Sequence, residues 1–225
     1  MDGVNKQLEK IGDTPVFVMS ALKFDCCEKV GEIIIAAPQN DAARYEKLAR
    51  NFGVTKLAAV TEGGATRFLS VKNALERVSP KADFIAIHDG ARPLILTEDI
   101  ERVLLDAEKY NAAIAAVPAS DTVKLVGANG FIESTPPRSK VYYAQTPQVF
   151  RLDVALAAHE RAERDGFVGT DDASLVERDG GRVACVDSSR DNIKVTLPED
   201  LAIAEAALAP GHVSSGEAAG GGEAV

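Results

Sequence analysis

The chain has 225 residues, with 25 Lys and Arg against 34 Asp and Glu, and its formal net charge is −9. Hydrophobic residues make up 46% of it, which supports a packed core and excludes an intrinsically disordered protein. The acidic balance, without a run of Lys or Arg, argues against binding to nucleic acid or to a membrane surface. No apolar stretch has membrane-spanning length, and the three cysteines (Cys26, Cys27 and Cys185) are expected to be reduced thiols of a cytoplasmic protein.

The first half of the chain alternates helix and strand patterns. Asp13-Thr14-Pro15 predicts the capped start of a buried helix over 16–22, and the apolar run 32–37 predicts a buried parallel strand. The pattern then predicts a helix that Asn40 caps and Gly53 ends, a strand over 56–60, a helix over 67–78, a strand over 83–87, a helix over 97–109 and a strand over 112–117. This alternation indicates an α/β fold, with a Rossmann-like, mostly parallel sheet covered by helices on both faces. Such sheets bind ligands at the carboxyl ends of their strands.

The alternation ends at Ser120. Segments 122–126 and 131–135 flank a glycine-containing turn, which predicts a β-hairpin, and we interpret residues 120–143 as an interaction arm. Helices over 152–164 and 173–177, a strand over 183–186 and a helix over 198–208 complete a single domain of residues 1–208. The tail 209–225 is rich in Gly, Ser and Ala and is expected to be disordered.

The segment His88-Asp89-Gly90-Ala91-Arg92-Pro93 follows a predicted buried strand. A carboxylate beside a glycine at the end of such a strand is well placed to hold Mg²⁺ near a phosphate, so Asp89 is the first candidate. Asp89 could equally cap a turn and pair with Arg92. His88 by itself is more typical of a packed or turn histidine.

Three further segments carry groups that suit a phosphate ligand. Gly63-Gly64 precedes a predicted helix and would let the backbone approach an anion, although on this pattern alone we favour a plain tight turn. The hydroxyl groups of Thr146 and Thr170 could bind a phosphate or a sugar alcohol. Thr170 or Asp171 could equally be a helix N-cap, and for Asp172 we favour that interpretation. Lys194 lies in a strand-like apolar run and is expected to have a partner, because a buried lone ammonium is costly.

Taken in order, these segments resemble the 2-C-methyl-D-erythritol 4-phosphate cytidylyltransferase family, which has a fold of the nucleotide-diphospho-sugar transferase type. The matching blocks are Asn5-Lys6-Gln7, Gly63-Gly64 through Arg67 to Ser70, residues 88–93, Pro118 through Asp121 to Lys124, Arg138, residues 145–148, residues 170–173 and residues 192–196. The resemblance spans about Val4 to Leu208. It implies that the 4-phosphate of the sugar alcohol attacks the α-phosphorus of CTP, with Mg²⁺ as cofactor, in non-mevalonate isoprenoid biosynthesis.

The resemblance also implies roles for individual residues. The residues it makes catalytic are Lys6, Asp89 and Lys194, and Asp89 would also hold Mg²⁺. Those that would bind the nucleotide are Gly63, Gly64, Arg67, Ser70, Ala91 and Arg92. Those that would bind the sugar-alcohol phosphate are Thr122, Arg138, Thr146, Thr170 and Lys194. Thr122 and Arg138 lie on or beside the arm, which in this family reaches into the neighbouring subunit's site, so a homodimer is expected.

The chain departs from the family at its N-terminus. The family opens with a strand and a Gly-rich loop containing an arginine, which wraps the triphosphate, whereas here only Met1-Asp2-Gly3-Val4 precede Asn5. We therefore expect a chain that is truncated at its N-terminus. The strands that would flank the missing strand should have unpaired backbone groups. Such a chain should be unstable or nearly inactive with CTP. The alternatives are a ribitol 5-phosphate cytidylyltransferase and an inactive truncated remnant. The blocks 145–148 and 170–174 favour the methylerythritol enzyme.

Overall fold

The computed structural model describes residues 6–209. Its elements in chain order are η1 (Lys6–Leu8), β1 (Lys10–Ile11), β2 (Thr14–Pro15), α1 (Val16–Cys26), β3 (Ile33–Ala37), α2 (Ala42–Asn51), β4 (Leu57–Glu62), α3 (Arg67–Leu75), β5 (Phe84–Ile87), α4 (Thr97–Tyr110), β6 (Ala112–Pro118), β7 (Leu125–Val126), β8 (Ile132–Ser134), η2 (Arg138–Lys140), β9 (Tyr142–Arg151), α5 (Leu152–Arg164), α6 (Asp172–Arg178), β10 (Ala184–Asp187) and α7 (Pro198–Ala207). Most of these match the sequence predictions within a few residues. The predicted disordered tail, apart from Ala209, lies outside the described residues.

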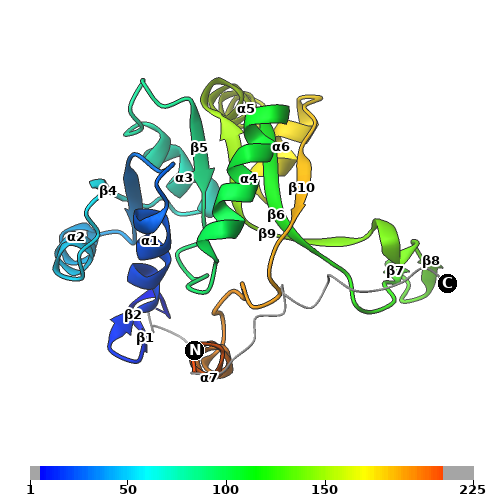
Figure 1. The fold of residues 1–225 in the computed structure, drawn as a ribbon. Coiled ribbons are helices and arrows are strands. Elements are labelled where there is room, and N and C mark those ends of the chain that lie inside the picture. The colour runs from blue at the N-terminus through cyan, green and yellow to red at the C-terminus, as the bar shows by residue number, and fades with distance from the viewer. Residues whose placement is uncertain (1–5, 210–225) are drawn as a thin grey trace.

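Four strands form the main sheet in the order β10-β6-β9-β5 (Figure 1). Strand β10 is parallel to β6, whereas β9 is antiparallel to both β6 and β5. Strands β5, β6 and β10 therefore run in one direction, as the α/β prediction requires. The sequence analysis did not predict β9, which returns directly from the hairpin and so needs no crossover helix.

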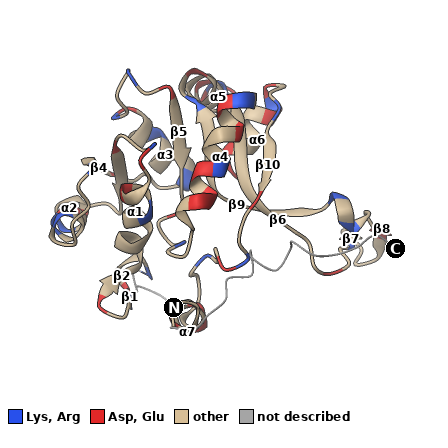
Figure 2. Ribbon diagram, viewed as in Figure 1, with Lys and Arg blue, Asp and Glu red and all other residues tan. Residues whose placement is uncertain are grey.

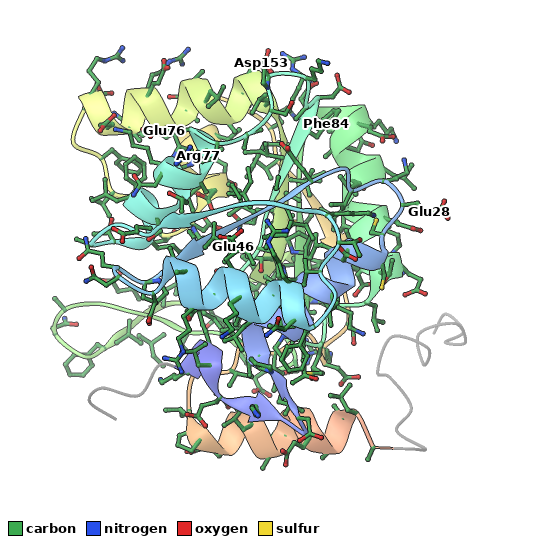
Figure 3. All side chains as sticks on the ribbon, turned by 90° about the vertical axis from the view of Figure 1, so that its left-hand side faces the viewer. Glu28, Glu46, Glu76, Arg77, Phe84 and Asp153 are labelled. Atoms are coloured by element: carbon green, nitrogen blue, oxygen red, sulfur yellow. The ribbon has the colours of Figure 1, made fainter. Side chains whose placement is uncertain are left out.

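Helices cover both faces of this sheet (Figure 1). Neighbouring residues of β9 point to opposite faces: Val149 packs with α1 and α4, and Phe150 packs with α3, α5 and α6. Strand β6 is rich in alanine, and its residues from Ala112 to Val117 are buried. Figure 3 shows the layers from the side, with α5 at the top, α2 across the middle and α7 at the bottom. There, Phe84 and Asp153 mark the starts of β5 and α5 at the same end of the fold.

A groove separates the main sheet from the parallel pair β3-β4. Within residues 6–209, β3 pairs with β4 and β5 pairs with β9, but β3 and β5 do not pair with each other. Residues 33–36 of β3 and 84–87 of β5 line the groove together with side chains of α1 and α3, and its volume is about 940 Å³. Among the described residues, both strands thus have one edge without a strand partner, as the sequence analysis expects. Most of β3 is consequently half-buried rather than fully buried as predicted.

Two helix starts differ from the sequence predictions. Helix α1 begins after Pro15 without a side-chain cap, because Thr14 and Pro15 pair with β1 and the amide of Val16 donates to the Glu9 carbonyl (2.9 Å). Helix α2 begins after Asp41, and Asn40 has a left-handed backbone (φ 67°).

Strands β7 and β8 form the predicted hairpin, which projects from the body of the fold (Figure 1). It presents apolar side chains to solvent, of which Phe131 is 74% exposed. Separately, none of the helices within residues 6–209 is both long and apolar enough to cross a bilayer.

Candidate functional site

Asp89 is the centre of the candidate site. It lies two residues beyond β5, at the carboxyl end of the strand, and its side chain is 14% exposed. Its Oδ1 lies 3.3 Å from Arg67 Nε, and its Oδ2 lies 2.9 Å from Lys194 Nζ. Arg92 Nε is 3.7 Å from Oδ2. The structure therefore brings together four of the predicted site residues from segments that are far apart in the sequence.

The charge around Asp89 is predominantly positive. Burial alone would raise the pKa of Asp89, but its hydrogen bond and ion pair with Lys194, with the charges of Arg67 and Arg92, hold the pKa below its ordinary value. Asp89 thus faces three cations, and Asp172 also pairs with one of them, Arg67, so the group keeps an excess positive charge that suits a phosphate ligand. Elsewhere Lys and Arg alternate with Asp and Glu, for example along α4 and α5 (Figure 2).

Thr146 links Asp89 to the main sheet. Its Oγ1 accepts a hydrogen bond from the Asp89 amide (3.0 Å) and lies 3.0 Å from His88 Nδ1. His88 Nε2 lies 3.1 Å from the Arg92 carbonyl, which can only accept, so Nε2 carries the proton and Nδ1 accepts from the Thr146 hydroxyl. Burial lowers the pKa of His88 to about 4, so the ring is neutral near pH 7. His88 is therefore a packed histidine, one of the roles considered from the sequence.

The two glycines before α3 allow a close approach of backbone to helix. A Cβ on Gly64 would lie 2.2 Å from Leu69 Cβ, and one on Gly63 would lie 3.0 Å from the Ala37 carbonyl. The Gly64 amide donates to Ser70 Oγ (3.0 Å), so this loop folds back onto the first turn of α3. Three of the residues expected to bind the nucleotide are thereby adjacent.

Arg67 connects this loop to a buried carboxylate, Asp172. Arg67 Nη1 lies 2.7 Å from Asp172 Oδ2, and Asp172 Oδ1 lies 3.2 Å from His159 Nε2. Burial alone would raise the pKa of Asp172, but His159 and Arg67 outweigh it and the pKa is lowered. The helix cap of α6 is Asp171, so the interpretation of Asp172 as a cap is wrong. Sequence reasoning missed this role because only the fold brings α3, α5 and α6 together.

Lys194 has the partner that the sequence predicts, although it does not lie in a strand. Residues 192–196 belong to no helix or strand and lie beside the 88–92 loop, with the Val195 amide donating to the Ala91 carbonyl (2.8 Å). Lys6 donates from Nζ to the carbonyl of Thr196, two residues beyond Lys194. Lys6 therefore lies beside the segment that supplies Lys194.

Three other predicted site residues are not brought to Asp89 in this chain. Thr122 and Arg138 are exposed on or beside the arm, where Arg138 donates to the Ser120 carbonyl (3.0 Å). Thr170 is exposed in the loop before α6. Their assignment to the substrate stays a prediction.

The groove between β3 and β5 ends at this site. Arg67, Ser70, Asp89, Ala91 and Lys194 all line it, together with apolar side chains of both strands. Within residues 6–209, no three or more His, Cys, Asp or Glu side chains gather into a metal site. A metal at Asp89 would therefore draw most of its ligands from substrate and water.

Comparisons with known proteins agree on one family. The family of 2-C-methyl-D-erythritol 4-phosphate cytidylyltransferases matches residues 1–210. A relative of that name from Geobacillus kaustophilus is 42% identical over 208 residues, covering 92% of this chain and 90% of the relative. One from Geotalea uraniireducens is 41% identical, covering 91% and 89%.

Solved structures of the same kind have the same fold. The 4-diphosphocytidyl-2C-methyl-D-erythritol synthase of Anaerococcus prevotii has a TM-score of 0.83 at 28% identity, covering 88% of both chains. The 2-C-methyl-D-erythritol 4-phosphate cytidylyltransferase of Thermus thermophilus has a TM-score of 0.75 at 31% identity, covering 89% of this chain and 92% of that one. The chain therefore belongs to the 2-C-methyl-D-erythritol 4-phosphate cytidylyltransferase family.

Proposed function

We propose that this chain transfers the cytidylyl group of CTP to 2-C-methyl-D-erythritol 4-phosphate. An oxygen of the 4-phosphate forms a bond to the α-phosphorus, the bond from the α-phosphorus to the bridging oxygen breaks, and pyrophosphate leaves. The observation that supports this is the group of three cations around Asp89 at the carboxyl end of β5. Because no covalent enzyme intermediate is needed, positioning and charge stabilisation can supply the catalysis.

The two substrates are assigned to opposite sides of Asp89. The nucleotide lies against the side formed by Gly63, Gly64, Arg67 and Ser70, of which Arg67 and Ser70 line the groove, and Ala91 and Arg92 continue that wall. The sugar-alcohol phosphate lies toward Thr146, Thr170 and Lys194. Lys194 then faces the phosphate oxygens at the reacting centre, where its charge offsets the charge that develops on them. Lys6 is assigned to the triphosphate.

Mg²⁺ fits this site through Asp89. Protein sites for Mg²⁺ commonly provide one or two carboxylates and leave the remaining positions to phosphates and water, and Asp89 provides one carboxylate. When bound, the ion would neutralise phosphate charge and hold the α-phosphate in line. Arg67 and Lys194, which now contact both oxygens of Asp89, would turn toward the phosphates of the bound substrates.

The test is Asp89→Asn, with turnover measured as pyrophosphate release and the product identified by mass spectrometry. We expect turnover to fall by at least about 100-fold, because the carboxylate that contacts all three cations is lost. The control is Asp25→Asn, since Asp25 accepts hydrogen bonds from Thr55 and Lys56 away from the site. Near-normal turnover in Asp89→Asn would contradict the role of Asp89. Faster turnover of ribitol 5-phosphate by the unmodified chain would contradict the substrate.

We further propose a homodimer that forms through the arm. The support is a hairpin whose side chains Leu125, Val126, Phe131 and Ile132 are each more than half exposed. In the dimer, Thr122 and Arg138 would reach the partner's substrate. Deleting residues 127–130 should weaken dimerisation and turnover together, and a fully active monomer in analytical ultracentrifugation would contradict the proposal. We place the reaction in the cytoplasm, where the free thiols of Cys26, Cys27 and Cys185 would stay reduced.

A further inference from the structure

Asn192 occupies the junction of the segments that surround Asp89. It lies five residues after β10, and it is completely buried (0% exposed). Its side-chain Nδ2 donates two hydrogen bonds, one to Gln145 Oε1 (2.8 Å) and one to the Thr146 carbonyl (3.0 Å). Both acceptors belong to β9, so the amide ties the segment 192–196 to the main sheet.

The backbone of Asn192 makes a second connection. Its carbonyl accepts a hydrogen bond from Arg92 Nη1 (2.6 Å), and its amide donates to the Ser189 carbonyl (3.2 Å). Arg92 is thereby held at 3.7 Å from Asp89. Asn192 thus fixes the positions of strand β9, Arg92 and its own loop relative to one another.

Each group that Asn192 holds is one step from Asp89. Thr146 accepts from the Asp89 amide, Arg92 contacts the Asp89 carboxylate, and Lys194, two residues along the chain, pairs with the same carboxylate. Two acceptors face the amide group, and only a side chain with two donors can satisfy both. Aspartate would set lone pairs against them, and leucine would leave both acceptors unpaired.

We infer that Asn192 is a positioning residue that fixes Thr146, Arg92 and Lys194 relative to Asp89 without touching substrate. The expected loss of turnover rests on the proposed function, whereas the expected displacement of Thr146, Arg92 and Lys194 does not. Because a misplacement of about 1 Å can cost about 100-fold in rate, loss of the amide should reduce kcat strongly. Arg92 also belongs to the wall assigned to the nucleotide, and its guanidinium donates to the Asn192 carbonyl. The KM for CTP should therefore rise together with the KM for the sugar phosphate.

The test compares Asn192→Leu, which keeps the branching of the side chain and removes the donors, with Asp99→Asn. Asp99 is a matched control: it is buried (2% exposed) and accepts from Ser188 Oγ (2.8 Å) and the Ser189 amide (2.9 Å) in the same loop, away from Asp89. For both variants we would measure thermal stability, kcat, the KM for each substrate, and the crystal structure. Asn192→Ala is the second variant, in case leucine is not accommodated.

We expect the Asn192 and Asp99 variants both to lose stability, but only substitution of Asn192 to lower kcat by about 100-fold and to raise the KM for both substrates. In the crystal structure of the Asn192 variant, Arg92 and Lys194 should have moved out of contact with Asp89. Retention of both contacts, or equal kcat losses in the two variants, would overturn the inference. Complete inactivity of the unmodified chain would contradict the proposed function instead, and the crystal structures would still decide the positioning role.

Discussion

The four-stranded sheet and the β3-β4 pair contain equally apolar strands but differ in burial. Every residue of β6 from Ala112 to Val117 is buried, whereas in β3 only Ala37 is. Strand β6 has a hydrogen-bonded neighbour on each side and helices on both faces. Strand β3 has one neighbour in the described structure, and its other edge faces the groove. An apolar run therefore predicts a strand, but its neighbours decide how far it is buried.

The candidate site lies where these two regions meet. Asp89 follows β5, which is the last strand of the four-stranded sheet and also one wall of the groove. The Asp89 amide donates to Thr146 of the four-stranded sheet, and Asn192 donates to the Thr146 carbonyl. On the nucleotide side, Ser70 lines the open groove, and Gly64 donates to its hydroxyl. We expect the substrate-phosphate side to be rigid and the nucleotide side to be less constrained.

The largest expected effect is a difference in the free energy of unfolding between two Ile→Ala substitutions, one in β6 and one in β3. Ile114→Ala in β6 removes a buried side chain of the closed core and should lower the free energy of unfolding by about 3 to 4 kcal/mol. Ile34→Ala in β3 removes a half-buried side chain that lines the groove, and it should cost only about 1 kcal/mol. Urea unfolding of both variants measures this difference. Equal losses would show that β3 is as closely packed in solution as β6.

A smaller effect concerns pH and His88, which lines the groove at the end of β5. Its pKa is lowered to about 4, so on acidification the unfolded chain takes up this proton first, and stability falls from about pH 6.5 to about pH 4. The loss is at most about 3 kcal/mol. A second loss of stability is expected below about pH 4, where Asp89 and Asp172 become protonated. The pKa values of both carboxyl groups are also lowered.

The matching variant is His88→Gln, which keeps a donor and an acceptor but does not titrate. Its stability, measured by urea unfolding between pH 4 and 7, should lack the decline seen in the unmodified chain over that range. An unchanged pH profile would mean that water in the groove solvates the ring and that its pKa is near the ordinary value.

The mildest test leaves the molecule unaltered and measures amide hydrogen exchange. Amides of β6 between Ala113 and Ala116 should exchange only through global unfolding, because both edges of the strand are paired. The amides of β3 that do not face β4 should exchange faster by several orders of magnitude. Mass spectrometry of peptides from the two strands provides the comparison. Equal protection would mean that the edge of β3 is covered in solution.

The sequence by itself determined most of the elements and the centre of the site. Helix α5 begins and ends where its periodicity predicts, and β5 leads directly into the loop that carries Asp89. Such features depend on residues close together in the chain, through side-chain spacing, glycine and proline. Arg67, Arg92 and Lys194 could also be named from motifs, and they do converge on Asp89.

The tertiary structure alone decided which of these groups meet and what surrounds them. It placed the antiparallel strand β9 between β5 and β6, paired Asp172 with Arg67 instead of using it as a cap, and buried Asn192 between Thr146 and Arg92. It also left β3 and β5 apart, with a groove between them. These outcomes depend on contacts between residues up to about a hundred positions apart. Local propensity does not encode such contacts, because burial and hydrogen bonding across the fold decide them.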